Sequence, residues 1–245
     1  MNAEITIAGI PMRISFRLPE TIQYFREYIT QENCPDYDVR VTDEDITSYP
    51  LVCPSCVLGP YSEHYMLIAR ASQYLLRFNR VLFHGVAFLW HGKAWLITAP
   101  SGVGKTTQLR HWQRLYGDQI QIINGDKVVL ELRPDGRTWV HPSPWTGKER
   151  DAGHCDGELA GIIILEQADH NAIRRLSARE SVLRVFEQFL ILGEETDEVL
   201  SVGRMEDQLL NTVPVWLLEN LGDEASAVMT HSILEKYEAT RYESI

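Results

Sequence analysis

Residues 96–107 read Leu-Ile-Thr-Ala-Pro-Ser-Gly-Val-Gly-Lys-Thr-Thr, a spacing typical of a loop that binds phosphate groups. Gly102 and Gly104 allow the backbone to curl so that consecutive N–H groups point at one anion. Lys105 can reach the terminal phosphates of a nucleotide, and the Thr106 hydroxyl can ligate Mg²⁺. We therefore expect ATP to bind here, at Ser101, Gly102, Val103, Gly104, Lys105, Thr106 and Thr107.

The segments on either side of this loop are those that a phosphate site needs. The apolar run 94–97 predicts a strand that enters the loop, and residues 107–116 are compatible with a helix that leaves it. Such a helix points the positive end of its dipole at the bound anion. The first loop position is usually glycine but is Ala99 here, and a methyl group is tolerated there only if the local φ is negative.

Two other polar residues are candidates for chemistry. Asp126 follows the buried-type strand 120–123, so we expect it at a carboxyl-terminal strand end, where α/β sheets bind ligands. It could be a general base or a magnesium ligand, or else an ordinary turn aspartate, which the preceding Asn-Gly would also suit. His84 lies inside an apolar run, where a lone histidine is more often a satisfied core residue than a catalytic one.

Together these residues resemble the catalytic domain of the HPr kinase/phosphorylase family, a branch of the phosphoenolpyruvate carboxykinase-like phosphate-loop proteins. That family has a Leu-His-Gly strand, a Gly-x-Ser-Gly-x-Gly-Lys-Ser loop and a later Asp-Asp pair. The counterparts here are residues 84–86, 99–106 and 125–126. Small stand-alone HPr-kinase-like proteins also have Pro-Trp-Ser-Gly-Lys, Leu-Glu-Gln and Arg-Arg-Leu segments, which match 144–148, 165–167 and 174–176. The resemblance spans roughly residues 80–218.

The resemblance implies a role for each matching residue. Asp126 would accept the proton of the acceptor hydroxyl, His84 would be a catalytic histidine, and Lys105 would bind phosphate. The metal ligands would be Thr106, Asp126 and Glu158. The first aspartate of the family's pair is Gly125 here, and the family's Glu-x-Arg-Gly reads Glu-Leu-Ala-Gly from residue 158, without the arginine. Without the first aspartate, the chain would need another metal ligand or would bind metal more weakly. The missing arginine weakens the case for phosphorolysis and for HPr as the acceptor.

Three other basic residues fall near the expected site. Lys148 lies in a glycine-bearing loop and could contact the acceptor or a phosphate, or it could be a solvated loop lysine. Arg174 and Arg175 are neighbours on one expected strand, so they face opposite sides and at most one can point inward. We expect both arginines at the surface.

Composition excludes several classes of function. The chain has 245 residues, 44% of them hydrophobic, and a formal net charge of −11 without a basic stripe, so nucleic acid is not an expected partner. No apolar stretch approaches the roughly 20 residues of a membrane span, and no secretion signal is visible, so we expect a cytoplasmic protein. The four cysteines are too few for a disulfide framework, and we read Cys53 and Cys56 as loop thiols without metal.

Periodicity divides the chain into an N-terminal sheet and helix extension, residues 1–59, and a catalytic domain, residues 60–245. The extension should contain a hairpin over 4–16, a helix over 20–28, a strand over 38–41 and a connecting loop. In the domain the expected strands are 81–90, 94–98, 120–123, 127–132, 138–140, 158–166, 172–176 (a neighbour of 158–166) and 213–218. The expected helices are 61–78, with Tyr65 on its buried stripe, 107–116, 178–192, one within 195–211, and 223–237.

The sequence thus predicts an α/β fold with a mixed sheet and an HPr kinase/phosphoenolpyruvate carboxykinase-like core. We expect a Mg²⁺-dependent, ATP-using kinase whose acceptor is a hydroxyl group of a peptide, a protein or a small molecule. The alternative is a regulatory or assembly protein that binds or hydrolyses ATP without transferring phosphate, which Gly125 and Ala99 favour. Carboxykinase chemistry on oxaloacetate is less favoured, because the chain is short for that family's substrate lobe. A homo-oligomer stays open.

Overall fold

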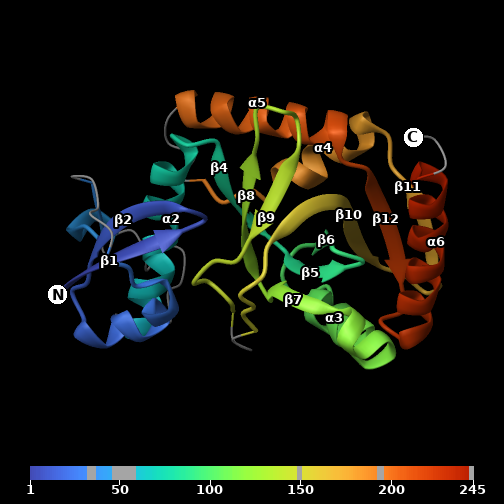
Figure 1. The fold of residues 1–245 in the computed structure, drawn as a ribbon, viewed down its shortest axis with the longest axis horizontal. Helices are drawn as coiled ribbons and strands as arrows, with labels where there is room; N and C mark the ends of the chain where they lie inside the picture. Colours follow the sequence, from blue (N-terminus) through green and yellow to red (C-terminus); the bar gives the residue numbers. More distant parts are fainter. Residues whose placement is uncertain (32–36, 46–58, 148–150, 192–195, 243–245) are drawn as a thin grey trace.

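The computed structural model describes residues 1–31, 37–45, 59–147, 151–191 and 196–242 (Figure 1). Within these ranges the strands form a three-stranded and a nine-stranded sheet, flanked by helices. The helices are α2 (Pro60–Leu76), α3 (Lys105–Tyr116), α4 (Ala178–Phe186), α5 (Thr196–Thr212) and α6 (Glu224–Tyr242). Short 3-10 helices span Pro19–Tyr24, Arg26–Tyr28 and Gly117–Gln119. The molecule is therefore of the mixed α/β class that the sequence predicts.

The small sheet is built on the expected hairpin. Strands β1 (Asn2–Ile7) and β2 (Ile10–Ser15) pair in antiparallel register, and β3 (Asp38–Arg40) adds to β2 in parallel. Ala8 and Gly9 make the turn with φ values of 49° and 74°. Period-two alternation buries one face of the hairpin. The expected helix over 20–28 is instead two 3-10 helices that are interrupted at Phe25.

Helix α2 joins the small sheet to the large one. Its apolar face packs against the hairpin on one side and against Leu82 and Val129 of the large sheet on the other, in one continuous buried cluster. Figure 1 shows α2 (teal) standing beside β1 and β2 (blue). The division of the chain at residue 59 stays a prediction.

Three parallel strands form the part of the large sheet that leads into the glycine loop, residues 99–104. Strand β6 (Lys93–Thr98) pairs with β10 (Gly157–Gln167), and β10 pairs with β12 (Val215–Asn220). On the other side of β6, β5 (Val86–Trp90) runs antiparallel to β6. Beyond it, β7 (Gln121–Asn124) runs antiparallel to β5 and hence in the direction of β6. Helices α3 and α6 cover one face of these strands, and α4 and α5 cover the opposite face. The carboxyl ends of the three parallel strands thus meet at the edge where the loop begins.

The rest of the large sheet is antiparallel. Strands β4 (Arg80–His84), β8 (Lys127–Leu132) and β9 (Thr138–His141) follow one another in the sheet, and β9 pairs with the first residues of β10. The expected hairpin across residues 134–136 is present as β8 and β9.

The expectation of one strand over 81–90 is wrong, because the chain breaks into β4 and β5 at Gly85. The Gly85 N–H donates to the Asp126 carbonyl oxygen at 2.8 Å. A Cβ atom at Gly85 would lie 3.0 Å from the carbonyl oxygen of Ile97, so the close approach of the backbone needs glycine. Before the break, β4 pairs with β8, and after it, β5 pairs with β6. His84 is therefore the last residue of β4.

Two other expectations need correction. Strand β11 (Ala172–Arg175) pairs with β12 and is not the neighbour of β10, because β6 and β12 already occupy the two edges of β10 there. Helix α4 ends at Phe186, well before residue 192, and the chain then continues to Gln188, whose carbonyl oxygen accepts from the His84 N–H. Two residues further on, Leu190 lines the pocket that holds the candidate site.

Among the helices of the described residues, none has the length and apolar character to cross a membrane. The cysteines Cys34, Cys53 and Cys56 lie outside the described residues.

Glu206 of α5 generates a prediction about stability. Its side chain is buried, one carboxyl oxygen has no hydrogen-bond partner among the described residues, and burial raises the pKa of Glu206 to about 7. The folded protein therefore holds a proton there between about pH 4.5 and 7 that the unfolded chain releases, so stability falls as pH rises through this window. We expect Glu206→Gln to gain about 1–2 kcal/mol of unfolding free energy at pH 8 and little at pH 5.

Thermal denaturation at the two pH values measures this difference. The exposed Glu20→Gln is the matched control and should change neither value. Equal effects of Glu206→Gln at pH 5 and pH 8 would contradict the assignment.

Candidate active site

One pocket brings most of the expected site residues together. It has a volume of about 540 Å³ and lies between the glycine loop, the β4–β5 link, the β7–β8 turn and the start of α2. The expected residues that line it are His84, Ser101, Gly102, Gly104, Lys105, Thr106, Thr107 and Asp126. Residues that line it without having been expected are Tyr61, Tyr65, Lys127, Thr146, Gly147 and Leu190.

The loop has the backbone geometry that its glycines suggest. Gly102 and Gly104 have φ values of 84° and 115°, a region in which side chains are strained. Gly104 is the residue before α3, so the amino-terminal end of that helix faces the pocket. The described non-glycine residues with positive φ are Ala8, Asn79 and His91, so Ala99 meets the condition under which its methyl group fits.

Lys105 is held against the loop that precedes it. Its side chain is buried, and its Nζ donates to the carbonyl oxygens of Ala99 at 2.9 Å and Pro100 at 3.4 Å. Burial lowers the pKa of Lys105, while the negative charge of Asp126 acts in the opposite direction. Phosphate oxygens are stronger acceptors than these carbonyl groups because the hydrogen bond is charge-assisted on both sides.

Asp126 faces the same pocket between the side chains of His84 and Lys127. The His84 Nε2 lies 3.4 Å from one carboxylate oxygen, and the Lys127 ammonium group forms an ion pair with the other. Burial alone would raise the pKa of Asp126, but the hydrogen bond with His84 and the charge of Lys127 outweigh it and lower that pKa. Asp126 is therefore a carboxylate at neutral pH, able to bind a cation or accept a proton.

The Asn124 side chain builds the turn that presents Asp126. Its Oδ1 accepts from the backbone N–H groups of Asp126 and Lys127 at 2.9 Å and 3.0 Å. Its Nδ2 donates to the Ser143 carbonyl oxygen at 2.8 Å, and Asn124 is fully buried. Asn124 and Gly125 thus form a turn, as expected for an Asn-Gly pair. The turn directs the Asp126 side chain into the pocket.

His84 is not a core residue. Its side chain is 22% exposed, lines the pocket and contacts Asp126. The break at Gly85 ends β4 at this position, which is why an apolar run delivers a polar side chain to the site.

Two glycines near Asp126, Gly125 and Gly147, occupy positions where a side chain would collide with a neighbouring aspartate. A Cβ atom at Gly147 would lie 3.0 Å from the Asp126 Cβ, and its φ of 73° is also unfavourable for other residues. A Cβ atom at Gly125 would lie 2.8 Å from the Asp151 Cβ, and the Gly125 N–H donates to the Asp151 carbonyl oxygen at 2.8 Å. Asp151 therefore fills the space that a side chain at position 125 would need.

The expectation that Glu158 ligates the same metal ion does not fit the structure. Glu158 lies at the amino-terminal end of β10, where it forms an ion pair with Lys93 at 2.8 Å. The loop leaves the opposite end of β6, next to Ile164, about 20 Å away at the usual rise of a strand. A spacing in sequence could not show which end of the strand the glutamate occupies.

Arg174 and Arg175 do not line the pocket. Arg174 pairs with Glu180 at 2.8 Å, and the Arg175 guanidinium lies 5.6 Å from the centre of the Tyr237 ring, so both are surface residues as expected. Lys148 lies outside the described residues.

Tyr61 and Tyr65 are residues that the sequence did not single out for the site. Sequence periodicity placed Tyr65 on the buried stripe of α2, but it is 43% exposed and Tyr61 is 46% exposed. They are four residues apart, hence on one helical face, and that face borders the pocket. Lys127 was missed as well, although it directly follows Asp126 in sequence.

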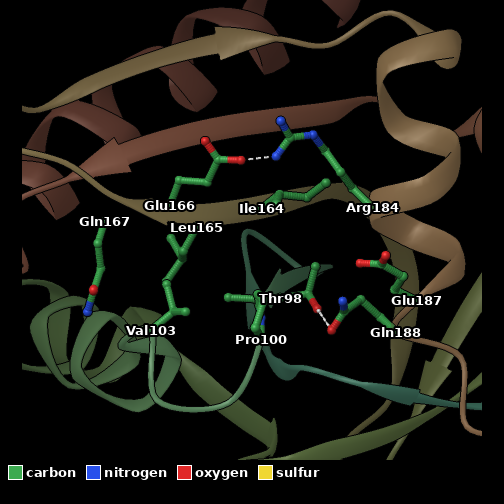
Figure 2. A pocket seen from close by; sticks show the side chains of 11 residues that line it. Thr98, Pro100, Val103, Ile164, Leu165, Glu166, Gln167, Arg184, Glu187 and Gln188 are labelled. Atoms are coloured by element: carbon green, nitrogen blue, oxygen red, sulfur yellow. Dashed lines mark hydrogen bonds and ion pairs between the residues drawn. The ribbon is translucent and has the colours of Figure 1, made fainter.

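A second pocket, of about 360 Å³, adjoins the loop above the carboxyl ends of β6 and β10 (Figure 2). Val103, the remaining loop residue expected to bind nucleotide, lines this pocket. Figure 2 shows the ion pair between Glu166 and Arg184, and the hydrogen bond of 3.2 Å from Thr98 to Gln188. Neither His84, Lys105 nor Asp126 lines this second pocket. The candidate catalytic groups thus gather on the other side of the loop.

Comparison with known proteins gives no family assignment. No family model and no curated protein matches the sequence. Among solved structures, the chain is similar to the Hpr(Ser) kinase/phosphatase from Coxiella burnetii, with 11% identity over 66% of this chain and 98% of that chain and a TM-score of 0.38. A similarity this low indicates only a distant fold relationship.

The buried turn around Asn124 generates a prediction. Asn124→Ala removes three hydrogen bonds and leaves the Ser143 carbonyl and two N–H groups without that partner. We expect a loss of about 2–4 kcal/mol of unfolding free energy in urea denaturation. The exposed Asn211→Ala, at the end of α5, is the control. A loss below about 0.5 kcal/mol would show that this turn does not depend on Asn124.

Proposed function

We propose that this protein is a Mg²⁺-dependent, ATP-using phosphotransferase that transfers the γ-phosphoryl group to a hydroxyl acceptor. One observation carries the proposal: the glycine loop, the Lys105 ammonium group and the Asp126 carboxylate line a single pocket. Phosphoryl transfer needs these three components, namely a phosphate cradle, a cation and a group that accepts the acceptor's proton.

The loop and α3 would hold the triphosphate. Backbone N–H groups of residues 101–107 and the amino-terminal end of α3 favour negative charge. Lys105 would exchange its two carbonyl acceptors for oxygens of the β- and γ-phosphates. The ammonium group is already positioned at the loop, so little reorganisation is needed.

The residues present fit a magnesium ion bound mainly through the nucleotide. Thr106 and Asp126 supply hard oxygen atoms at the pocket. The described residues contain no group of three or more His, Cys, Asp or Glu side chains suited to a metal. Mg²⁺ commonly takes one or two protein oxygens and completes its shell with phosphate oxygens and water, and it would supply charge neutralisation of the phosphates here.

Asp126 would accept the proton of the acceptor hydroxyl. The acceptor O–H bond breaks as its oxygen bonds to the γ-phosphorus, the bond from that phosphorus to the β-phosphate oxygen breaks, and ADP leaves. Asp126 is ionised for this role, and its contact with His84 orients it. The acceptor belongs to the hydroxyl-bearing class, whether peptide, protein or small molecule.

The second candidate, a nucleotide-binding regulator without transfer, has an observation of its own. Both oxygens of Asp126 already have partners, His84 and Lys127, and the space beside Gly125 is filled by Asp151. A carboxylate that stayed paired in this way could fix the turn and perform no proton transfer.

Labelled ATP separates the two candidates. We expect the wild type with Mg²⁺ and a pool of hydroxyl compounds to transfer label from the γ-phosphate to an acceptor. Asp126→Asn should keep nucleotide binding and lose about 10²–10⁴ in rate, the usual contribution of a general base. The exposed Asp118→Asn should keep full activity. Release of free phosphate alone would favour the regulator, and full turnover in Asp126→Asn would remove Asp126 from the mechanism.

A further inference from the structure

Lys127 is a buried cation that the proposed mechanism has not used. Its side chain is only 6% exposed although it lines the pocket. Three hydrogen bonds fix its backbone: its N–H donates to Asn124 Oδ1 at 3.0 Å and to the Trp145 carbonyl at 3.2 Å, and its carbonyl accepts from Ser143 Oγ at 2.6 Å. Burying an ammonium group costs free energy unless it is paired, so its position requires a partner.

The Lys127 ammonium group has more N–H donors than it has hydrogen-bond acceptors among the described residues. Lys127 Nζ pairs with Asp126 and lies 5.1 Å from the centre of the Tyr65 ring. An ammonium group has three N–H donors, and the hydrogen bonds within the described residues account for one of them. The two others have no acceptor among the described residues, so an anion that enters the pocket could accept from them.

Lys105 and Lys127 approach the pocket from different elements. Lys105 begins α3 beside the loop, whereas Lys127 begins β8 beside the β7–β8 turn. Besides burial, the charge of Lys127 contributes to the lowered pKa of Lys105, so the two ammonium groups interact electrostatically. The pocket thus holds two lysine charges and the single carboxylate of Asp126, and a polyanion would compensate the excess.

The order of these groups indicates which phosphate would meet Lys127. A chain of phosphates on the loop has its end group next to Asp126, if Asp126 is to serve the transferred phosphoryl group. Lys127 contacts Asp126 directly, so it lies at that end, while the loop and Lys105 hold the phosphates before it. A diphosphate on the loop is one group shorter and leaves Lys127 paired with Asp126.

We propose that Lys127 is a second cation for the terminal phosphate, which it binds by moving from Asp126, and that it makes the pocket prefer nucleoside triphosphates to diphosphates. The inference rests on the proposed function, because it assumes that phosphates bind on the loop. It adds a consequence: a bound triphosphate takes Lys127 away from one carboxylate oxygen, and Asp126 then presents that oxygen to the acceptor hydroxyl.

Binding measurements without an acceptor test the inference. With Mg²⁺ present, calorimetry would give the Kd of ADP and of a non-hydrolysable ATP analogue for the wild type and Lys127→Met. We expect the analogue to bind about 10- to 100-fold more weakly to Lys127→Met, the equivalent of one charge-assisted hydrogen bond, and ADP to change less than about threefold. Lys236→Met removes the same charge from the exposed face of α6 and should change neither Kd.

Two further measurements keep the test decisive. Inorganic tripolyphosphate and pyrophosphate should show the same difference, which would assign it to the phosphates and not to the nucleoside. In the wild type, acetylation of Lys127 followed by mass spectrometry should be slowed by the ATP analogue and not by ADP, which tests the inference even if Lys127→Met does not fold.

The outcomes separate this inference from the proposed function. If Lys127→Met weakens both nucleotides equally, or neither, and Lys127 acetylation is the same with both, the inference is wrong while loop binding stands. If the wild type binds neither nucleotide, or Lys105→Met leaves both Kd values unchanged, the proposed function is wrong. The inference about Lys127 is then wrong as well, because it assumes that phosphates bind on the loop.

Discussion

The site depends on one backbone hydrogen bond, from the N–H of Gly85 to the carbonyl oxygen of Asp126. It holds the break between β4 and β5 against the turn between β7 and β8, two places separated by about 40 residues of chain. Because of it, His84 and Asp126 reach the same pocket as the loop at the end of β6. Gly85 permits the contact, since any side chain there would meet the Ile97 carbonyl.

Each charged side chain in the pocket has a hydrogen-bond or ion-pair partner. Lys105 uses loop carbonyls, Lys127 uses Asp126, and Asp126 also has His84. Pairing offsets the desolvation that burial imposes on each ion. The same pairs are exchangeable: a phosphate chain could replace the carbonyls and the carboxylate as partners of the two lysines. The paired side chains are thus compatible with the binding of a polyanion.

The sequence predicted the parts of this arrangement that depend on local chemistry. The Gly-x-Gly-Lys-Thr spacing indicated the loop, and the apolar run before Asn124 placed Asp126 at a strand end. The break at Gly85 could not be predicted, because 81–90 is one apolar run and the reason for the break is a carbonyl group distant in sequence. Glu158 was misplaced for a similar reason, since a motif does not reveal strand direction, and helical periodicity could not tell that Tyr65 faces a pocket.

A crystal structure of the protein with Mg²⁺ and a non-hydrolysable ATP analogue would show whether the terminal phosphate lies beside Asp126. We expect the triphosphate on residues 101–107, with its terminal phosphate between Lys105 and Asp126 and within reach of an acceptor oxygen held by that carboxylate. A triphosphate bound in the second pocket beside Glu166, or a terminal phosphate directed away from Asp126, would contradict it.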